Sequence, residues 1–201
     1  MNATTNYQLN QWEASDRVLR TDFNADNAKI EAALSGLEER AAALDRLATN
    51  IAYQAGQLGI VDQAANRRGI SCRGMVCEAF VVSSGYDCTG GVVVANDKAS
   101  LTGAGAVGTV TAERRINLGT DMTHCKLWLH CSGDRVTPTV NGQSMEKIRS
   151  FYDPSSAHST AVCFEYTCSG LPVNRDCIIT LEMECKTGSP VEVYDFWAVF
   201  Y

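Results

Sequence analysis

Three histidines are the first candidates for chemistry in this chain, because an imidazole can act as a general base or as a metal ligand. They are His124, His130 and His158. The first two flank one predicted strand, and six residues of strand separate them by about 20 Å. Two ligands of one ion cannot lie so far apart, so we expect no metal site there.

Familiar catalytic motifs are missing from the sequence. It contains no G-x-S-x-G, H-E-x-x-H or phosphate-binding loop. Residues 103–108 fit G-x-G-x-x-G, but no strand–helix–strand unit surrounds them, so we predict a loop rather than a nucleotide site. A glycoside hydrolase would need two carboxylates facing one cleft, and the sequence does not pair its loop aspartates. We therefore expect no enzymatic activity, no cofactor and no metal.

Two predicted loops, residues 83–87 and 151–158, have the composition of a carbohydrate-binding surface. A sugar offers an apolar face and a rim of hydroxyl groups, which suit aromatic rings beside polar side chains. The predicted ligand-binding residues are Tyr86, Asp87, Tyr152, Asp153 and His158. The alternative is that the tyrosines only cover the edge of the domain. Trp128 is a third candidate, equally suited to a subunit interface.

From about residue 69 onward the apolar residues recur with a period of two, which is typical of strands. Asn141-Gly142 predicts a tight hairpin turn, because type I′ turns need a positive φ at both positions. Eight or nine short strands separated by turns predict an antiparallel β-sandwich, jelly-roll-like. The predicted strands are 75–82, 91–95, 109–118, 125–131, 136–140, 143–148, 161–168, 177–186 and 191–201. The last of these is apolar on both faces near its end, which favours a central or interface strand.

Nine cysteines are an odd number, and no two form a C-x-x-C motif. Several share a face with apolar residues, as Cys125 and Cys131 do with Leu127 and Leu129. Because a free cysteine behaves as a small buried hydrophobe, we expect reduced core thiols. Disulfides formed after release from a cell are the alternative.

Before the predicted strands, the sequence contains a heptad repeat that begins at Phe23. A strict seven-residue apolar period predicts a left-handed coiled coil, here a parallel oligomeric stalk over residues 23–66. Leu47 at a flanking position widens the seam and favours three helices. The alternative is one amphipathic helix packed on its own domain. The predicted seam consists of Phe23, Ile30, Leu34, Leu37, Ala41, Leu44, Ala48, Ile51, Ala55 and Leu58.

The amino-acid composition argues against two classes of binding partner. A net charge of −6 and a pI near 5.1 argue against nucleic acid and against an anionic membrane surface. The sequence has no run of about 18 apolar residues, so we expect no transmembrane helix. The first ten residues are polar and do not resemble a secretory signal, so we expect synthesis and folding in a cytosol.

Residues 1–22 form a distinct segment, and its aromatic and apolar side chains favour docking onto a larger assembly. The predicted attachment residues are Tyr7, Leu9, Trp12, Arg17 and Val18. The segment reads N-Y-x-L-x-x-W at 6–12 and D-R-V-x-R-x-D-F-N at 16–24, followed by a helical stretch at 27–34. This order resembles the N-terminus of tail-fibre-like proteins of phages and prophages of Gram-positive gut bacteria. The resemblance covers about the first 35 residues only.

The resemblance implies a virion appendage, usually a homotrimer, attached by its N-terminus and carrying a variable distal domain. Such an appendage would be assembled in the host cytoplasm and would become extracellular with the virion. Residues 1–22 would contact other virion proteins, 23–66 would form the stalk, and 69–201 would form a head that binds a bacterial surface glycan. A purely structural head fibre, collar or baseplate component is the alternative, and a polysaccharide depolymerase is a third.

Overall fold

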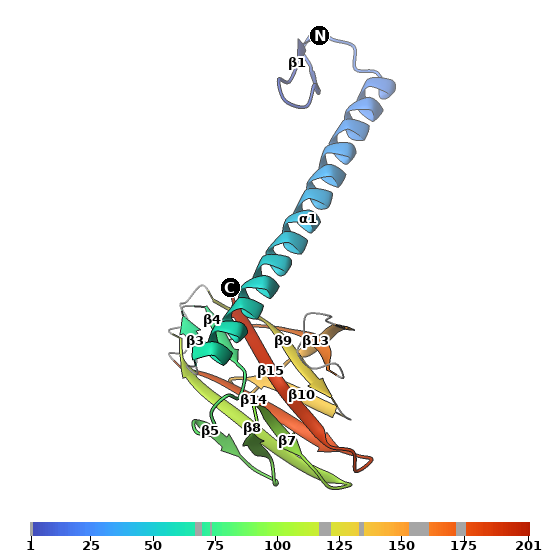
Figure 1. Ribbon diagram of the computed structural model, residues 1–201. Coiled ribbons are helices and arrows are strands. Elements are labelled where there is room, and N and C mark those ends of the chain that lie inside the picture. Colours follow the sequence, from blue (N-terminus) through green and yellow to red (C-terminus); the bar gives the residue numbers. More distant parts are fainter. Residues whose placement is uncertain are drawn as a thin grey trace. The chain divides into compact units, whose positions relative to one another are not determined.

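The computed structural model describes residues 2–66, 70–72, 74–116, 122–132, 135–152, 161–171 and 176–201. The chain divides into two compact units, Met1–Ile51 and Ala52–Tyr201. In the described residues, the protein consists of antiparallel β-sheets and a single helix (Figure 1). The predicted sandwich is therefore confirmed as a sandwich-like fold.

Helix α1 (Arg20–Asn66) runs for 47 residues without a break. No proline interrupts the sequence before Pro138, so every amide in this stretch can join the helical ladder. The helix begins three residues before the predicted start, because the Leu19 carbonyl accepts hydrogen bonds from the amides of Asp22 and Phe23 at 3.1 and 3.2 Å. Within the described residues, no helix is long and apolar enough to cross a membrane.

The first unit also contains a small hairpin of β1 (Asn2–Ala3) and β2 (Asn10–Gln11). The hairpin is tied to the first turns of α1. The Asn10 amide donates to the Asp26 carboxylate at 2.9 Å, and the Lys29 ammonium bonds the Gln8 carbonyl at 2.5 Å and Asp26 at 3.2 Å. These polar contacts hold the β1–β2 hairpin against the first turns of α1.

One sheet of the second unit has five strands, all paired antiparallel. In spatial order they are β11 (Gln143–Ser144), β10 (Arg135–Val140), β14 (Asp176–Cys185), β8 (Ala106–Arg115) and β5 (Tyr86–Cys88). Asn141 and Gly142 connect β10 to β11 with φ values of 49° and 77°, which confirms the predicted hairpin turn.

The other sheet has eight strands, again antiparallel. Its main order is β12 (Glu146–Phe151), β13 (Val162–Ser169), β9 (His124–Ser132), β15 (Val191–Phe200), β4 (Met75–Glu78) and β3 (Ile70–Cys72). The hairpin of β6 (Val93–Ala95) and β7 (Lys98–Leu101) joins β15 through β7. The predicted central position of the final strand is confirmed, since β15 pairs on both sides.

The main core lies between the two sheets. Alternate residues of β14, from Cys177 to Cys185, and of β9, from Cys125 to Cys131, are buried in it, as their spacing predicts. The eight cysteines whose side chains the structure describes are reduced thiols outside any disulfide, and all but Cys88 are buried. Burial raises the pKa of Cys177 to about 12, which is the behaviour of a core thiol rather than a reactive one.

A bulge between Val193 and Asp195 changes which face of β15 each residue occupies. Before it, Val193 points into the main core; after it, Phe196 does, and Asp195 and Trp197 turn to the outer face of the sheet. The simple alternation expected over 191–201 is therefore broken in the middle of the strand. A bulge adds one residue and so inverts every later side chain.

The outer face of the eight-stranded sheet is covered by the last turns of α1. Trp128 and Trp197 are fully buried there and stack with ring centroids 5.9 Å apart. Tyr53 of the helix contacts both rings, at 6.0 and 5.1 Å between centroids. The packing boundary at Ile51/Ala52 therefore lies inside the helix, earlier than the change of secondary structure between 66 and 69.

Candidate functional site

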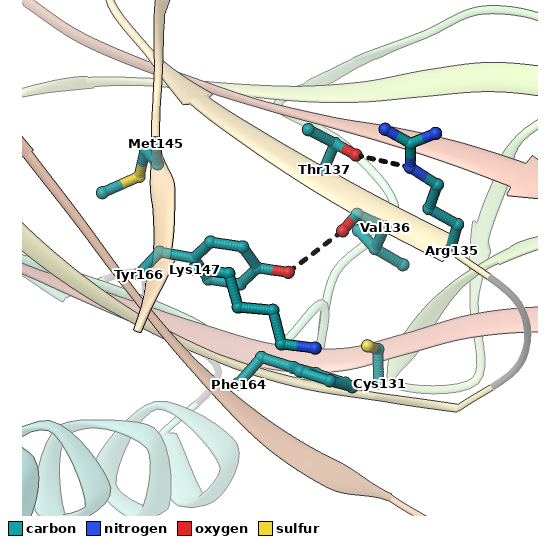
Figure 2. Close-up of a pocket in the computed structure, with 8 residues that line it drawn as sticks. All are labelled: Cys131, Arg135, Val136, Thr137, Met145, Lys147, Phe164 and Tyr166. Carbon is teal, nitrogen blue, oxygen red and sulfur yellow. Dashed lines mark hydrogen bonds between the residues drawn. The ribbon is translucent and has the colours of Figure 1, made fainter. Parts of the chain in front are cut away.

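A cavity of about 340 Å³ opens at the edge of the sandwich, where β10 of one sheet faces β12 and β13 of the other (Figure 2). This volume is at the lower end of the range for small-molecule sites, about 300–1,000 Å³. Its lining residues are Cys131, Arg135, Val136, Thr137, Met145, Lys147, Phe164 and Tyr166.

Strand register directs Lys147 into the cavity. Lys147 lies directly opposite Tyr166 on the neighbouring strand, and opposite residues share a face of the sheet. Tyr166 belongs to the main core, so Lys147 also points to the inner face. A bulge between Lys147 and Arg149 then places Arg149 opposite Glu165, and these two form an ion pair at 2.6 Å. The bulge thus places the two cations of β12 in different surroundings, Lys147 beside Tyr166 and Arg149 beside Glu165.

Tyr166 links the two sheets beside the cavity. Its hydroxyl donates to the Val136 carbonyl at 3.1 Å, which links the two sheets across the edge (Figure 2). Burial, with a smaller contribution from Cys131, raises the pKa of Tyr166 to about 12. The hydroxyl therefore remains a neutral hydrogen-bond donor at physiological pH.

The Lys147 ammonium lies 4.0 Å from the centroid of the Phe164 ring, a cation–π contact. Figure 2 shows its side chain extending toward Phe164 and Cys131. Burial raises the pKa of Cys131 to about 12, although the positive charge of Lys147 opposes this shift. Among the described residues, no carboxylate pairs with Lys147.

Arg135 lies at the rim of the cavity and is already engaged. Its guanidinium donates to the Thr137 hydroxyl at 3.3 Å and to the Glu184 carboxylate at 3.4 Å. In the register of β10 and β14, Arg135 is opposite Glu184, whereas Val136 is opposite the core residue Met183. Arg135 therefore belongs to the outer face of its sheet, and Lys147 is the cation that faces the cavity.

The lining combines apolar walls with one inward cation. It contains no aspartate or glutamate, so the described residues offer no acid–base pair for hydrolysis at this site. Nor do three or more potential metal ligands come together anywhere in the described part of the chain. The arrangement is suited to binding a small ligand that carries a negative charge.

Tyr86 and Asp87, predicted as loop residues that contact a ligand, lie on the edge strand β5. The Tyr86 hydroxyl donates to the Glu78 carboxylate at 2.7 Å, and the Arg114 guanidinium, itself paired with Glu78, lies 5.3 Å from the Tyr86 ring centroid. Glu78 is fully buried, so Tyr86 helps to satisfy a buried charge. Asp87 is exposed.

The other predicted ligand residues are apart from the cavity. Tyr152 follows β12, is 64% exposed and does not line the cavity. Asp153 and His158 lie outside the described residues. Trp128 is buried beneath α1 rather than exposed. The cavity itself was not anticipated, although the predicted alternation over 143–148 already places Met145 and Lys147 on one face.

The predicted attachment residues divide by exposure. Tyr7, Arg17 and Val18 are exposed, while Leu9 and Trp12 are half-buried. Among the predicted seam residues, the large side chains are exposed in the single chain, from 42% for Ile30 to 72% for Leu58. The other exposed large seam residues are Phe23, Leu34, Leu37, Leu44 and Ile51; Ala41 and Ala48 are also exposed, and Ala55 is half-buried.

Comparison with known proteins gives no family. No family model matches the sequence, and no curated protein matches it. Among solved structures, the chain is similar to TmCBM61, solved in complex with beta-1,4-galactotriose, with 12% identity over 59% of this chain and 90% of that one and a TM-score of 0.34. It is also similar to the enzymatically active domain of tailspike protein 4 of bacteriophage CBA120, with 9% identity over 67% of this chain but 18% of that one and a TM-score of 0.34. At these TM-scores, neither structure bears on the function of this chain.

Proposed function

We propose that the protein is a homotrimeric virion fibre that attaches by its N-terminal segment and presents a β-sandwich head to a glycan of the bacterial surface. The observation that carries the proposal is the exposed heptad seam of α1. Leu37, Leu44, Ile51 and Leu58 are each more than half exposed in the single chain. Full burial of an exposed side chain of this size is worth about 1.5–3 kcal/mol, so covering the part that is still exposed favours association along the seam.

Glycan binding in the head is supported by the cavity between β10, β12 and β13. Its described lining combines aromatic rings with polar side chains and contains no pair of carboxylates. These features favour a binding protein over a depolymerase. Three weak sites carried on one fibre would gain affinity through effective concentration.

Two measurements on the full chain test the proposal. Light scattering at several concentrations is expected to give three times 21.8 kDa. Fluorescently labelled protein is then expected to adhere to the surface of a Gram-positive host, and cells stripped of surface polysaccharide should lose this adhesion. A persistent monomer would contradict the fibre, and a trimer that adheres to no cell would favour the purely structural appendage.

A further inference from the structure

We infer that the edge cavity takes an anionic saccharide, one bearing a carboxylate or a phosphate ester, and that the ammonium of Lys147 recognises the negative charge. The inference rests on the proposed glycan-binding function and narrows it to a ligand class and a site. The ligand-binding residues predicted from the sequence belong to other loops, and those that the structure describes, Tyr86, Asp87 and Tyr152, do not line this cavity.

The first argument is the placement of charge. The chain carries a net charge of −6, yet the charged side chain that points into the cavity is a cation. Its described partner is the ring of Phe164, not a carboxylate. Lys147 is an exposed residue, so an anion can reach its ammonium from solvent. Because no carboxylate among the described residues pairs with it, an anion would bind without displacing an existing partner.

The second argument is the chemistry of the walls. Met145 and the ring of Tyr166 supply apolar and aromatic surface, which suits the carbon–hydrogen face of a sugar ring. The volume of about 340 Å³ accommodates a single sugar unit better than an extended oligosaccharide. Because the ammonium already covers the face of Phe164, the anion approaches Lys147 from the side away from that ring.

A different role for Lys147 makes a different prediction. A charged side chain pointing inward on an edge strand discourages pairing with another sheet, and β12 is the edge of its sheet. If that were its whole role, replacing Lys147 would promote aggregation but would leave the response to anions unchanged.

The experiment is a titration of the full chain with methionine methyl groups labelled with ¹³C. The chain has five methionines, and Met145 lines the cavity, so its signal, assigned with Met145→Leu, reports on this site. The probes are D-glucuronate, D-glucose 6-phosphate and neutral D-glucose. We expect a saturable shift of the Met145 signal with one or both anions, a weaker response as salt is raised, and none with glucose.

Lys147→Gln is expected to weaken anion binding about tenfold or more, because a hydrogen bond to a charged group is worth roughly 1.5–3 kcal/mol. Arg115→Gln is the matched control: it removes one positive charge from β8, where the side chain is 93% exposed and outside the cavity. A shift with glucuronate alone assigns a uronic acid, and one with glucose 6-phosphate alone assigns a phosphorylated sugar. No Met145 shift with either anion, an equal shift with glucose, or unchanged binding by Lys147→Gln would overturn the inference.

The inference and the proposed function fail separately. Host-cell adhesion that survives Lys147→Gln would overturn the assignment of this cavity while leaving glycan binding in place. A Lys147-dependent Met145 shift in a protein that adheres to no cell would support the anion site and contradict the proposed adhesion.

Discussion

Gly56 shows how one residue sets the contact between helix and sheet. A Cβ at this position would lie 1.9 Å from Cδ1 of Trp197, so only glycine permits the observed approach. Gly59 is similar, with its Cβ position 2.6 Å from Sγ of Cys77. Gly36 of the same helix has nothing within 4 Å. Helical propensity is the same for all three glycines. Gly56 and Gly59 differ from Gly36 only because other residues pack against them.

Gly56→Ala is therefore expected to destabilise the second unit by about 1–3 kcal/mol, the usual cost of overpacking. Gly36→Ala is the matched control and should raise helix stability by up to about 1 kcal/mol. Urea unfolding followed by tryptophan fluorescence measures both. Equal effects of the two substitutions would show that the helix does not pack on Trp197.

The rate at which each cysteine is alkylated reports whether that thiol is buried. Partial burial, and then the charge of Asp87, raise the pKa of the Cys88 thiol, so it stays protonated at neutral pH and its alkylation rate should rise as pH approaches that pKa. Cys88 is nevertheless exposed, so iodoacetamide should label it before the seven buried thiols among the described residues.

Asp87→Asn should accelerate the labelling of Cys88 at pH 8, because removing the negative charge lowers the thiol pKa. Peptide mass spectrometry over a time course gives the rate at each position. Asp97→Asn, on the exposed turn between β6 and β7, is the control. Labelling of Cys131 or Cys177 as fast as that of Cys88 would contradict the buried placement of those thiols.

At the scale of elements, α1 uses two different faces. Ala52, Tyr53 and Ile60 lie against the outer face of the eight-stranded sheet. Ile51 and Leu58, which belong to the heptad series, are exposed on another face of the same turns. The alternative of a single helix packed on its own domain thus holds for the last turns, but those turns do not use the heptad positions to do it.

Leu44→Asp is expected to convert an oligomer into a monomer, because it places a charge in the middle of the apolar seam. Ala42→Asp introduces the same charge on the opposite side of the helix and should leave the mass unchanged. Light scattering distinguishes the two. If the wild-type protein is an oligomer and Leu44→Asp leaves its mass unchanged, the subunits associate elsewhere than through the seam.

At the scale of the whole molecule, the second compact unit extends further toward the N-terminus than its β-strands do. The second compact unit begins at Ala52, and its helical turns cover Trp128 and Trp197. A fragment that begins after the helix would lose the turns that cover both indole rings.

Two truncations test this division. Residues 52–201 should fold with both tryptophans buried, whereas residues 69–201 should be less stable by at least about 2 kcal/mol, the contribution of one large buried apolar side chain. The shorter fragment should also show red-shifted tryptophan emission. Equal urea midpoints and equal emission would mean that α1 does not stabilise the head.

The sequence alone determined the features that follow from backbone periodicity. A period of two indicated the strands and the inward face of β9 and β14, because successive side chains of a strand point to opposite sides. A period of seven without proline indicated the long helix, and Asn141-Gly142 indicated its hairpin. Asn96 and Asp97, with φ values of 53° and 57°, form the turn between β6 and β7, which the same reasoning could have found but did not.

Only the tertiary structure decided the features that depend on what lies opposite a residue. The bulge in β15 reverses Asp195 and Trp197, Gly56 allows the helix to approach, and the register of β12 with β13 turns Lys147 into the cavity. None of these has a local periodic pattern, because each arises from contact between segments distant in the chain. The candidate site belongs to this second group, since its walls come from strands of two sheets.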